Sequence, residues 1–399
     1  MTTARPEVYF GSVKTGNKGA FAALAAKVDT IIKKMDFSSI EKKDKVAIKM
    51  HLGFREGYQT VPVFFVRRIV EAVKKIGGFP FITDNPTSVY NAVNRGYTQE
   101  TCGCPIIPVA GIKDKYTYKF KANFHNVKTL DMGGVLYDAD ALIDLSHVKG
   151  HNTCGFGGAI KNIALGGFSG PSRWKKIHGV EQSLPYWDAE KCTPEHAKKL
   201  KDACKDGYIT YDEEKHKLTV AFGMCHQCGD CLKADKGVGC LELKQENFSL
   251  FQEIMAIGAN EILKSFDEDK RFFLNFLLQI TPLCDCWGIG FPNVFNDIGV
   301  LGSRDIVAVE TATLDLIGKE KLIEEMIPLF MRPHLDPELD LHPFQRLHGP
   351  MKDPYIALKY AEDLGMGSRK YKLVEVLAPE ETLKMESPKS VSETEPTFF

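Results

Sequence analysis

Several features are scarce or missing in this chain of 399 residues, and each absence excludes a class of protein. Basic residues (51) and acidic residues (52) nearly balance, so no basic field exists that would attract nucleic acid or anionic lipid. No apolar run reaches the roughly 20 residues that a membrane-spanning helix needs. Residues 1–19 lack an apolar core of the signal-peptide kind. We therefore expect a cytoplasmic protein that binds neither membrane nor nucleic acid.

Nucleotide-binding motifs are missing as well. Residues 11–18 faintly resemble a phosphate-binding loop, but the Gly-Lys-Ser/Thr ending of that motif is absent. No glycine fingerprint for a nicotinamide or flavin cofactor is present, and no repeat recurs at solenoid spacing. Redox chemistry in this chain would therefore depend on a cofactor other than a nicotinamide or a flavin.

Cysteine is what the chain does contain. Its eleven cysteines are an odd number, which argues against complete disulfide pairing. Cys225, Cys228 and Cys231 form a C-x2-C-x2-C run. Thiolates at this spacing bind a [4Fe–4S] cluster, whereas zinc sites usually use separated C-x2-C pairs. The run therefore predicts one [4Fe–4S] cluster in a reducing, oxygen-poor setting, and a zinc knuckle or unliganded buried thiols are the alternatives.

The fourth ligand of this cluster has two candidates. Cys240 follows the run closely, and Cys204 precedes it by twenty intervening residues. In two-cluster ferredoxins the last cysteine of one motif binds the cluster of the other motif, which suits Cys204. Cys192 and Cys204 have the separation of the first and last ligands of such a motif, but its two middle cysteines are missing. The segment is thus interpreted as a two-cluster ferredoxin that has lost one cluster, with the fourth ligand left open.

Alternating apolar runs predict an α/β fold with a mostly parallel sheet flanked by helices, because the β-α-β order implies parallel strands. Strands are expected at Val46–Met50, Phe79–Thr83, Ile106–Val109, Ala141–Leu145, Phe272–Ile280 and Ile298–Leu301, and helices at Val61–Ile76, Ala159–Leu165, Phe248–Ser265 and Asp305–Ile317. The predicted domains are an α/β domain (1–185), a ferredoxin-like cluster-binding insert (186–245), a continuation of the α/β body (246–385) and a tail (386–399).

A glycine-rich segment, Ser146–Asn162, follows a predicted strand and leads into a predicted helix. A glycine turn at a helix N-terminus presents free backbone N–H groups to an anion, and Lys149 and Lys161 would add positive charge. His147 and His151 lie just beyond the carboxyl end of a strand, where α/β sheets usually bind ligands. A tight turn with two structural histidines is the alternative; the whole string favours a site for a small anionic substrate or a metal.

The segment Cys284-Asp285-Cys286 follows a buried apolar run. Two thiolates one residue apart can chelate a soft metal, contact a cluster edge or form a strained disulfide, and free thiols are the alternative. Cys102 and Cys104 form a second C-x-C pair, and the four cysteines would make one site if the fold brought them together. A structural role is favoured for His51, whereas Asp297 could be either a loop residue or a site carboxylate.

Taken in order, these segments resemble the iron–sulfur family called domain of unknown function 362. The resemblance rests on Lys49–Gly53, Thr83–Asn85, Ser146–Asn162, Cys284–Cys286, Asp297–Asp305 and Tyr360–Val376. It extends from about Tyr9 to Val376. It implies a ferredoxin-like insert with two four-cysteine motifs between the glycine-rich loop and the C-x-C segment. Most members have no established activity.

The chain departs from this family pattern in three places. The first cysteine motif is reduced to its two end cysteines, and the second has a lengthened spacer before Cys240. A second cluster is therefore doubtful. Phe54 stands where an acidic residue is expected, although Glu56 is close, and this weakens a metal or catalytic role for His51.

Three functions fit these features. The favoured one is an anaerobic oxidoreductase or reductase component, in which electrons reach a substrate or second metal held by His147, His151, Lys161, Cys284 and Cys286. The second is a ferredoxin-like electron-transfer protein, but about 60 residues would suffice for that role and most of the chain would be unexplained. The third is an accessory protein for metallocofactor assembly. A redox partner protein is expected in the first two cases.

Overall fold

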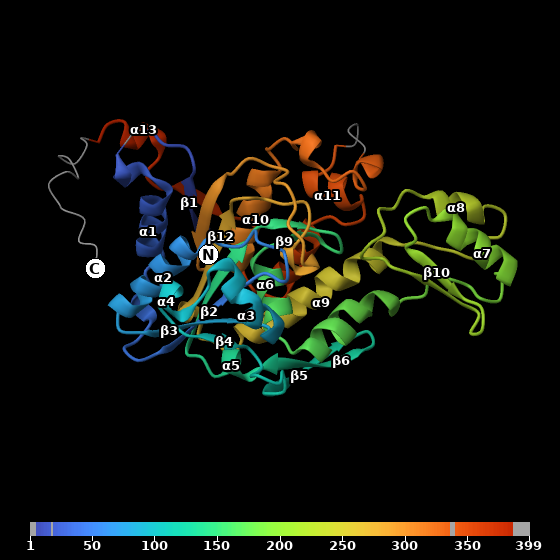
Figure 1. The fold of residues 1–399 in the computed structure, drawn as a ribbon, viewed down its shortest axis with the longest axis horizontal. Coiled ribbons are helices and arrows are strands. Elements are labelled where there is room, and N and C mark those ends of the chain that lie inside the picture. Colours follow the sequence, from blue (N-terminus) through green and yellow to red (C-terminus); the bar gives the residue numbers. More distant parts are fainter. Residues whose placement is uncertain (1–4, 17–18, 336–339, 386–399) are drawn as a thin grey trace.

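The computed structural model describes residues 5–16, 19–335 and 340–385, and an eight-stranded sheet forms its body (Figure 1). In spatial order the strands are β14 (Lys372–Glu375), β1 (Glu7–Ser12), β13 (Gly299–Ser303), β12 (Arg271–Leu277), β7 (Ala141–His147), β2 (Lys45–Met50), β3 (Phe79–Asp84) and β4 (Ile106–Pro108). Within this sheet only β13 runs against its neighbours, β12 and β1. The predicted α/β class with a mostly parallel sheet is confirmed.

Helices cover both faces of the sheet. One face is covered by α1 (Leu24–Met35) and α2 (Val63–Lys75), and the other by α6 (Ala159–Gly166), α9 (Gln245–Leu263), α10 (Ile306–Ile317) and α12 (Tyr355–Asp363). Successive side chains of a strand point to opposite faces. Accordingly Val46 and Ile48 belong to the core under α1 and α2, whereas Ala47 belongs to the core on the α6 face.

The predicted strands and helices are present within a few residues of their expected bounds. Asp305 caps α10 as expected, because its Oδ1 accepts a hydrogen bond from Ala308 N at 2.8 Å. The run predicted as a strand over 272–280 leaves the sheet at Leu277. The next carbonyl, that of Leu278, turns toward the ring of His147, whose Nε2 lies 2.9 Å away.

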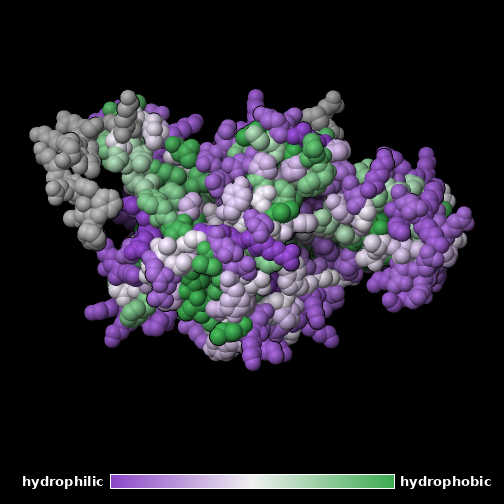
Figure 2. Space-filling model, viewed as in Figure 1, coloured by the Kyte–Doolittle hydropathy of each residue, from purple (hydrophilic) through white to green (hydrophobic). Residues whose placement is uncertain are grey.

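A small lobe stands at one end of the body, beside the start of α9 (Figure 1). It contains α7 (Pro194–Ala203), α8 (Asp230–Asp235) and an antiparallel hairpin of β10 (Ile209–Asp212) and β11 (Lys217–Val220). Its own apolar core includes Leu200, Leu218 and Phe222. In Figure 2 the outer end of the lobe is mostly hydrophilic.

The domain boundaries at 185 and 245 and the ferredoxin-like character of this lobe stay predictions. The predicted tail, 386–399, lies outside the described residues. No helix in the described part of the chain is both long and apolar enough to cross a lipid bilayer.

Candidate functional site

A cavity of about 580 Å³ opens at the carboxyl ends of the central parallel strands. Its wall includes Lys49 and His51 from the end of β2, Asp84 from the end of β3, and Lys149 from the segment after β7. Small-molecule sites usually measure roughly 300–1,000 Å³, and α/β sheets bind ligands at this edge. The cavity therefore has the size and the position of a ligand site.

A buried ion pair forms the floor of this cavity. Lys49 Nζ lies 3.1 Å from Asp84 Oδ1 and donates to Asn162 Oδ1 at 2.8 Å. Burial opposes ionisation of Asp84, but the Lys49 ammonium and hydrogen bonds hold the pKa of Asp84 well below its ordinary value. Burial lowers the pKa of Lys49, and the attraction of Asp84 works against that shift. Each charge therefore stabilises the other and offsets part of the cost of burial.

Asp84 also orients His51. Its Oδ2 accepts a hydrogen bond from Leu52 N at 3.1 Å and lies 3.2 Å from His51 Nδ1. His51 Nε2 is buried and has no hydrogen-bond partner among the described residues. His51 lines the cavity, so this unpartnered nitrogen belongs to a residue of the cavity wall. A purely structural role would leave that buried nitrogen unexplained.

Two further lysines bring positive charge into the cavity wall. Lys149 Nζ donates to the His147 carbonyl at 2.6 Å, and Lys161 Nζ lies 3.7 Å from Cys284 Sγ. Both lysines are buried, and no carboxylate of the described residues forms an ion pair with either. A buried cation without a carboxylate partner favours an anionic ligand.

The N-terminus of α6, in contrast, is already occupied. Glu310 of α10 accepts hydrogen bonds from Ala159 N (2.7 Å) and Ile160 N (3.4 Å). A Cβ at Gly158 would lie 2.1 Å from Glu310 Oε1, so the glycine makes room for this carboxylate. The expectation that these backbone N–H groups are free for an anion is therefore wrong, and the charge for anion binding comes from the lysine side chains.

The C-x-C segment places a thiol pair beside Lys161. Cys284 Sγ accepts a hydrogen bond from Cys286 N at 3.3 Å, and both cysteines line the cavity. The hydrogen bond from the Cys286 thiol, with the nearby Lys161 ammonium, lowers the pKa of Cys284 despite its burial. Sharing that proton raises the pKa of Cys286. The two residues therefore share one proton, and Cys284 is the more acidic thiol of the pair.

His151 and Cys154 lie on the same side of the site. His151 Nδ1 is 3.4 Å from Cys154 Sγ, and burial lowers the pKa of His151, so its ring is neutral. His151 lines the cavity as expected for a site residue. Cys154 itself does not line this cavity, and its thiol donates a hydrogen bond to the Phe156 carbonyl at 2.9 Å.

The structure places His147 behind the cavity wall. Its Nε2 contacts the carbonyl of Leu278, and its Nδ1 lies 3.6 Å from Asp285 Oδ2. His147 does not line the cavity. It therefore positions the loop that carries Cys284 and Cys286, and it has no direct access to a ligand.

The remaining sequence candidates lie elsewhere. Cys102 and Cys104 are buried in the core under α2, and Cys284 and Cys286 lie at the cavity, so the four do not gather into one site. Asp297 Oδ1 accepts a hydrogen bond from Gln279 N at 2.6 Å, which makes it a loop-stabilising residue.

In the lobe, four cysteines line one small cavity. They are Cys204, Cys225, Cys228 and Cys231. Tyr208 N donates to the sulfur of Cys204 at 3.2 Å, and Gln227 N donates to that of Cys225 at 3.4 Å. Cys240 does not line this cavity, and its thiol pairs with that of Cys192. The structure thus groups Cys204, and not Cys240, with the C-x2-C-x2-C run.

The segment before Cys225 joins the two cavities. Gly223 and Met224 line the large cavity, and Cys225, the next residue, lines the small one. The Gly223 carbonyl accepts hydrogen bonds from Asn152 Nδ2 (3.1 Å) and Lys352 Nζ (3.0 Å), which fix this segment to the body. The cysteine run therefore begins directly at the wall of the large cavity.

The Cys284–Cys286 pair leads to a prediction about reactivity. Iodoacetamide alkylates thiolates, so labelling of the wild-type pair should rise less steeply between about pH 6 and about pH 8 than labelling of an ordinary thiol, because the hydrogen bond from Cys286 and the Lys161 ammonium lower the pKa of Cys284. Lys161→Met removes the neighbouring cation, and labelling at about pH 6 should then fall several-fold relative to about pH 8. Mass spectrometry of the labelled peptide measures both rates.

Lys176→Met is the matched control for this experiment, because Lys176 pairs with Asp131 (2.8 Å) and does not line the cavity. The pH dependence of labelling in Lys176→Met should equal that of the wild type. A wild-type rate that rises about ten-fold per pH unit would show an ordinary thiol and contradict the prediction.

Comparisons with solved structures show distant likeness. The lactate racemase apoprotein from Thermoanaerobacterium thermosaccharolyticum aligns at a TM-score of 0.37 and 10% identity, over 79% of this chain and 57% of its own. A structural-genomics protein from Thermotoga maritima aligns at a TM-score of 0.34 and 11% identity, over 65% of this chain and 52% of its own. This chain thus spans little more than half the length of either protein.

No curated protein matches the sequence. A protein family, in contrast, matches it over most of its length. The family described as "Domain of unknown function (DUF362)" matches residues 46–315, which contain the ends of β2 and β3, the glycine-rich segment, both cysteine-lined cavities and the C-x-C segment. The chain belongs to the DUF362 family.

Proposed function

We propose that this protein is an iron–sulfur redox protein, an oxidoreductase or a reductase component that reduces a small anionic substrate bound in the large cavity. One observation carries the proposal: Met224 lines the substrate cavity, and Cys225, its neighbour in the chain, lines the cysteine cavity. The proposed electron-carrying site and the proposed substrate site are therefore adjacent. A one-electron donor protein would be oxidised, and the bound substrate would be reduced.

The four-cysteine cavity fits a [4Fe–4S] cluster. The cluster needs four thiolates, and Cys204 supplies the one that the C-x2-C-x2-C run lacks. Backbone N–H groups already point at the sulfurs of Cys204 and Cys225, as is typical of cluster ligands. When bound, the cluster supplies reversible one-electron transfer. Cys228 is exposed, which gives a partner protein an approach to this site.

The body residues would bind the substrate and manage its protons. Lys149 and Lys161 would hold a carboxylate or phosphate group of the substrate. His51, oriented by Asp84, lies in the cavity wall, and its unpartnered Nε2 would exchange a proton with the substrate. The proton shared by Cys284 and Cys286 is a second source.

A second candidate is an accessory protein that holds a metal or cluster for transfer to another protein. The Cys284–Cys286 pair favours it, because two sulfur ligands at the cavity wall suit a soft metal. Retention of iron through repeated chelation would argue against transfer. An electron-transfer protein without a substrate leaves the large cavity unexplained.

Anaerobic iron and sulfide analysis tests the proposal. We expect about four irons and about four sulfides per chain, with an electron paramagnetic resonance spectrum of a [4Fe–4S] cluster after reduction. Colourless protein, or zinc in the cysteine run, would contradict the redox function.

The same spectrum tests the connection between the two cavities. Phosphate or a small carboxylate, bound beside Cys225, should alter the signal of the reduced protein. Lys149→Gln with Lys161→Gln should abolish that change, and Lys176→Gln should preserve it. A normal cluster that never responds to anions would favour the electron-transfer role.

A further inference from the structure

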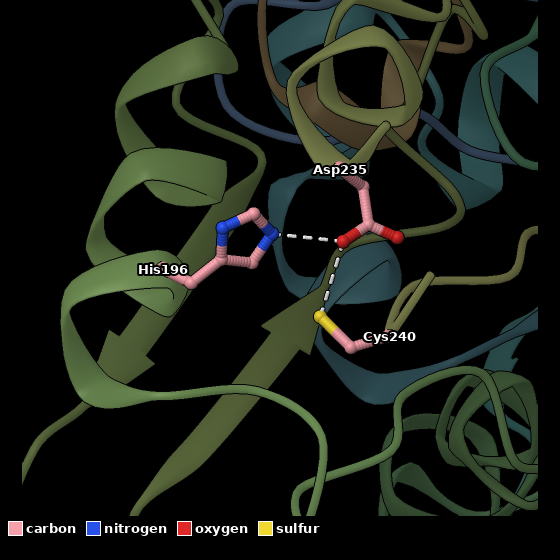
Figure 3. Close-up of side chains that lie close together, drawn as sticks. All are labelled: His196, Asp235 and Cys240. Atoms are coloured by element: carbon pink, nitrogen blue, oxygen red, sulfur yellow. Dashed lines mark hydrogen bonds and ion pairs between the residues drawn. The ribbon is translucent and has the colours of Figure 1, made fainter. Parts of the chain in front are cut away.

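A second group of metal-binding side chains lies in the lobe, separate from the four-cysteine cavity (Figure 3). His196 extends from α7 toward Asp235 at the end of α8, and its Nε2 lies 2.8 Å from Asp235 Oδ1. Cys240 Sγ lies 3.2 Å from the same oxygen. The ligand atoms of all three residues lie within 4.8 Å of one another.

Cys192 supplies a fourth donor. Its thiol forms a hydrogen bond with the thiol of Cys240, and both cysteines are only 2% exposed. Cys192 stands two residues before the first turn of α7, and His196 lies in that turn. Thr193 Oγ1 accepts a hydrogen bond from His196 N at 3.1 Å, which fixes the separation of these two ligands.

We propose that Cys192, His196, Asp235 and Cys240 bind one zinc ion with a structural role. Thiolate, imidazole and carboxylate are the ligand types of zinc, and four protein ligands make a closed tetrahedral site. The two sulfurs exclude calcium and magnesium, which prefer oxygen ligands. A cubane cluster needs four thiolates, and this group offers two.

Three of the four ligands, His196, Asp235 and Cys240, need little adjustment to accept the ion, and the Cys192 thiol, which lies outside their 4.8 Å group, would move toward them from its contact with Cys240. Zinc bonds of about 2.0–2.3 Å place tetrahedral ligand atoms about 3.3–3.8 Å apart. The observed separations of 2.8 Å and 3.2 Å are slightly shorter, as expected for ligands that hydrogen-bond to one another. The other oxygen of Asp235 accepts a hydrogen bond from Leu241 N at 2.8 Å, an outer contact typical of metal-bound carboxylates.

The position of the site explains what the ion would do. Cys204 directly follows α7, and Cys231 lies in the first turn of α8. The zinc ligands His196 and Asp235 belong to the same two helices, so the ion would tie α7 to α8 and thereby fix two cysteines of the other cavity. A lobe with a small apolar core gains stability from such a link.

The same arrangement accounts for the incomplete first cysteine motif. In two-cluster ferredoxins the end cysteine of each motif binds the cluster of the other motif. Here Cys204 lies with the second motif, and Cys240 lies with Cys192 of the first. His196 and Asp235 stand in for the two missing middle cysteines. A zinc ion would thus occupy the place of the lost cluster.

Metal analysis of the full chain, purified anaerobically from medium with zinc and iron, tests this site. We expect about one zinc per chain in addition to the iron. Asp235→Asn should weaken zinc retention against a chelator at least ten-fold, whereas Asp230→Asn, on the exposed side of α8, should leave it unchanged. Cys192→Ser with Cys240→Ser should lose the zinc.

Cobalt gives a readout on the wild-type protein, which avoids variants that fail to fold. Replacement of zinc by Co²⁺ should produce thiolate-to-cobalt absorption and the intense visible bands of a tetrahedral site. Wild-type protein without zinc, about eight irons per chain, or zinc retained by the double cysteine variant would each overturn the proposal. The inference does not depend on the redox function, because the zinc content tests the zinc site and the iron content tests the cluster. Either result can contradict its own proposal without affecting the other.

Discussion

Replacement of Cys204 by serine is expected to remove most of the iron and the brown colour from anaerobically purified protein. Cys204 lines the small cavity with the three cysteines of the C-x2-C-x2-C run, and loss of one thiolate leaves a corner of the cluster without its ligand. Iron analysis and visible absorption of the variant measure the effect. We expect a similar loss for Cys225→Ser, since its sulfur lies in the same cavity.

Cys240→Ser is the matched comparison. Cys240 is more buried than Cys204, Cys225 or Cys228, and its thiol faces Cys192 and Asp235. The variant should keep about four irons and lose zinc. If Cys240→Ser lost its iron while Cys204→Ser kept it, the grouping of cysteines in the lobe would be the reverse of the one we propose.

The sequence predicted most of the sheet because its central strands are continuous apolar runs that alternate with amphipathic helices. β1 and β14 were not predicted. β14 is a four-residue edge strand in which three positions are exposed, and its pairing with β1 joins residues more than 360 positions apart, which no local pattern can reveal. The hairpin of β5 (Thr117–Phe124) and β6 (Val127–Gly133) was missed for a similar reason, since β5 is largely exposed.

The site was predicted in part. His151, Lys161, Cys284 and Cys286 line the cavity, as expected from residue types at the ends of strands. Glu310 was not predicted, because a carboxylate that caps α6 from α10 is about 150 residues away in the chain. Which of Cys204 and Cys240 lies with the C-x2-C-x2-C run likewise depends on how α7 and α8 pack. The spacing of the cysteines in the sequence could not decide between them as the fourth ligand.

Lys49 and Asp84 show how a polar floor can be built into an apolar sheet. Lys49 lies on β2 between Ile48 and Met50, which point to the opposite face, so its side chain enters the core beside α6. Both charged groups are almost fully buried. A buried ion pair gives little net stability, but removal of one partner leaves an uncompensated charge.

Asp84→Asn should therefore lower the free energy of unfolding by about 3–5 kcal/mol, although it preserves the shape of the side chain. Asp144 also acts on Lys49, but burial raises the pKa of Asp144 to about 8, so near neutral pH this carboxyl is largely protonated. Without Asp84 the folded state therefore favours neutral Lys49, and the unfolded state binds more protons. The stability of the variant should then rise with pH toward the unfolded lysine pKa of about 10.4, and its defect should be largest at neutral pH and below. Urea unfolding of wild-type and variant protein with equal metal content measures the difference.

Asp29→Asn is the control, because Asp29 pairs with Arg68 at the surface, where both side chains are partly exposed. This substitution should lower the free energy of unfolding by less than about 1 kcal/mol. Lys49→Met with Asp84→Asn removes the isolated charge and should recover part of the loss, as expected when the cost comes from an unpaired ammonium and not from the amide itself. If Asp84→Asn lowered the free energy of unfolding as little as Asp29→Asn does, the Lys49 ammonium would have to be stabilised by water or by another carboxylate. The description of Lys49 and Asp84 as a buried pair at the floor of the cavity would then be wrong.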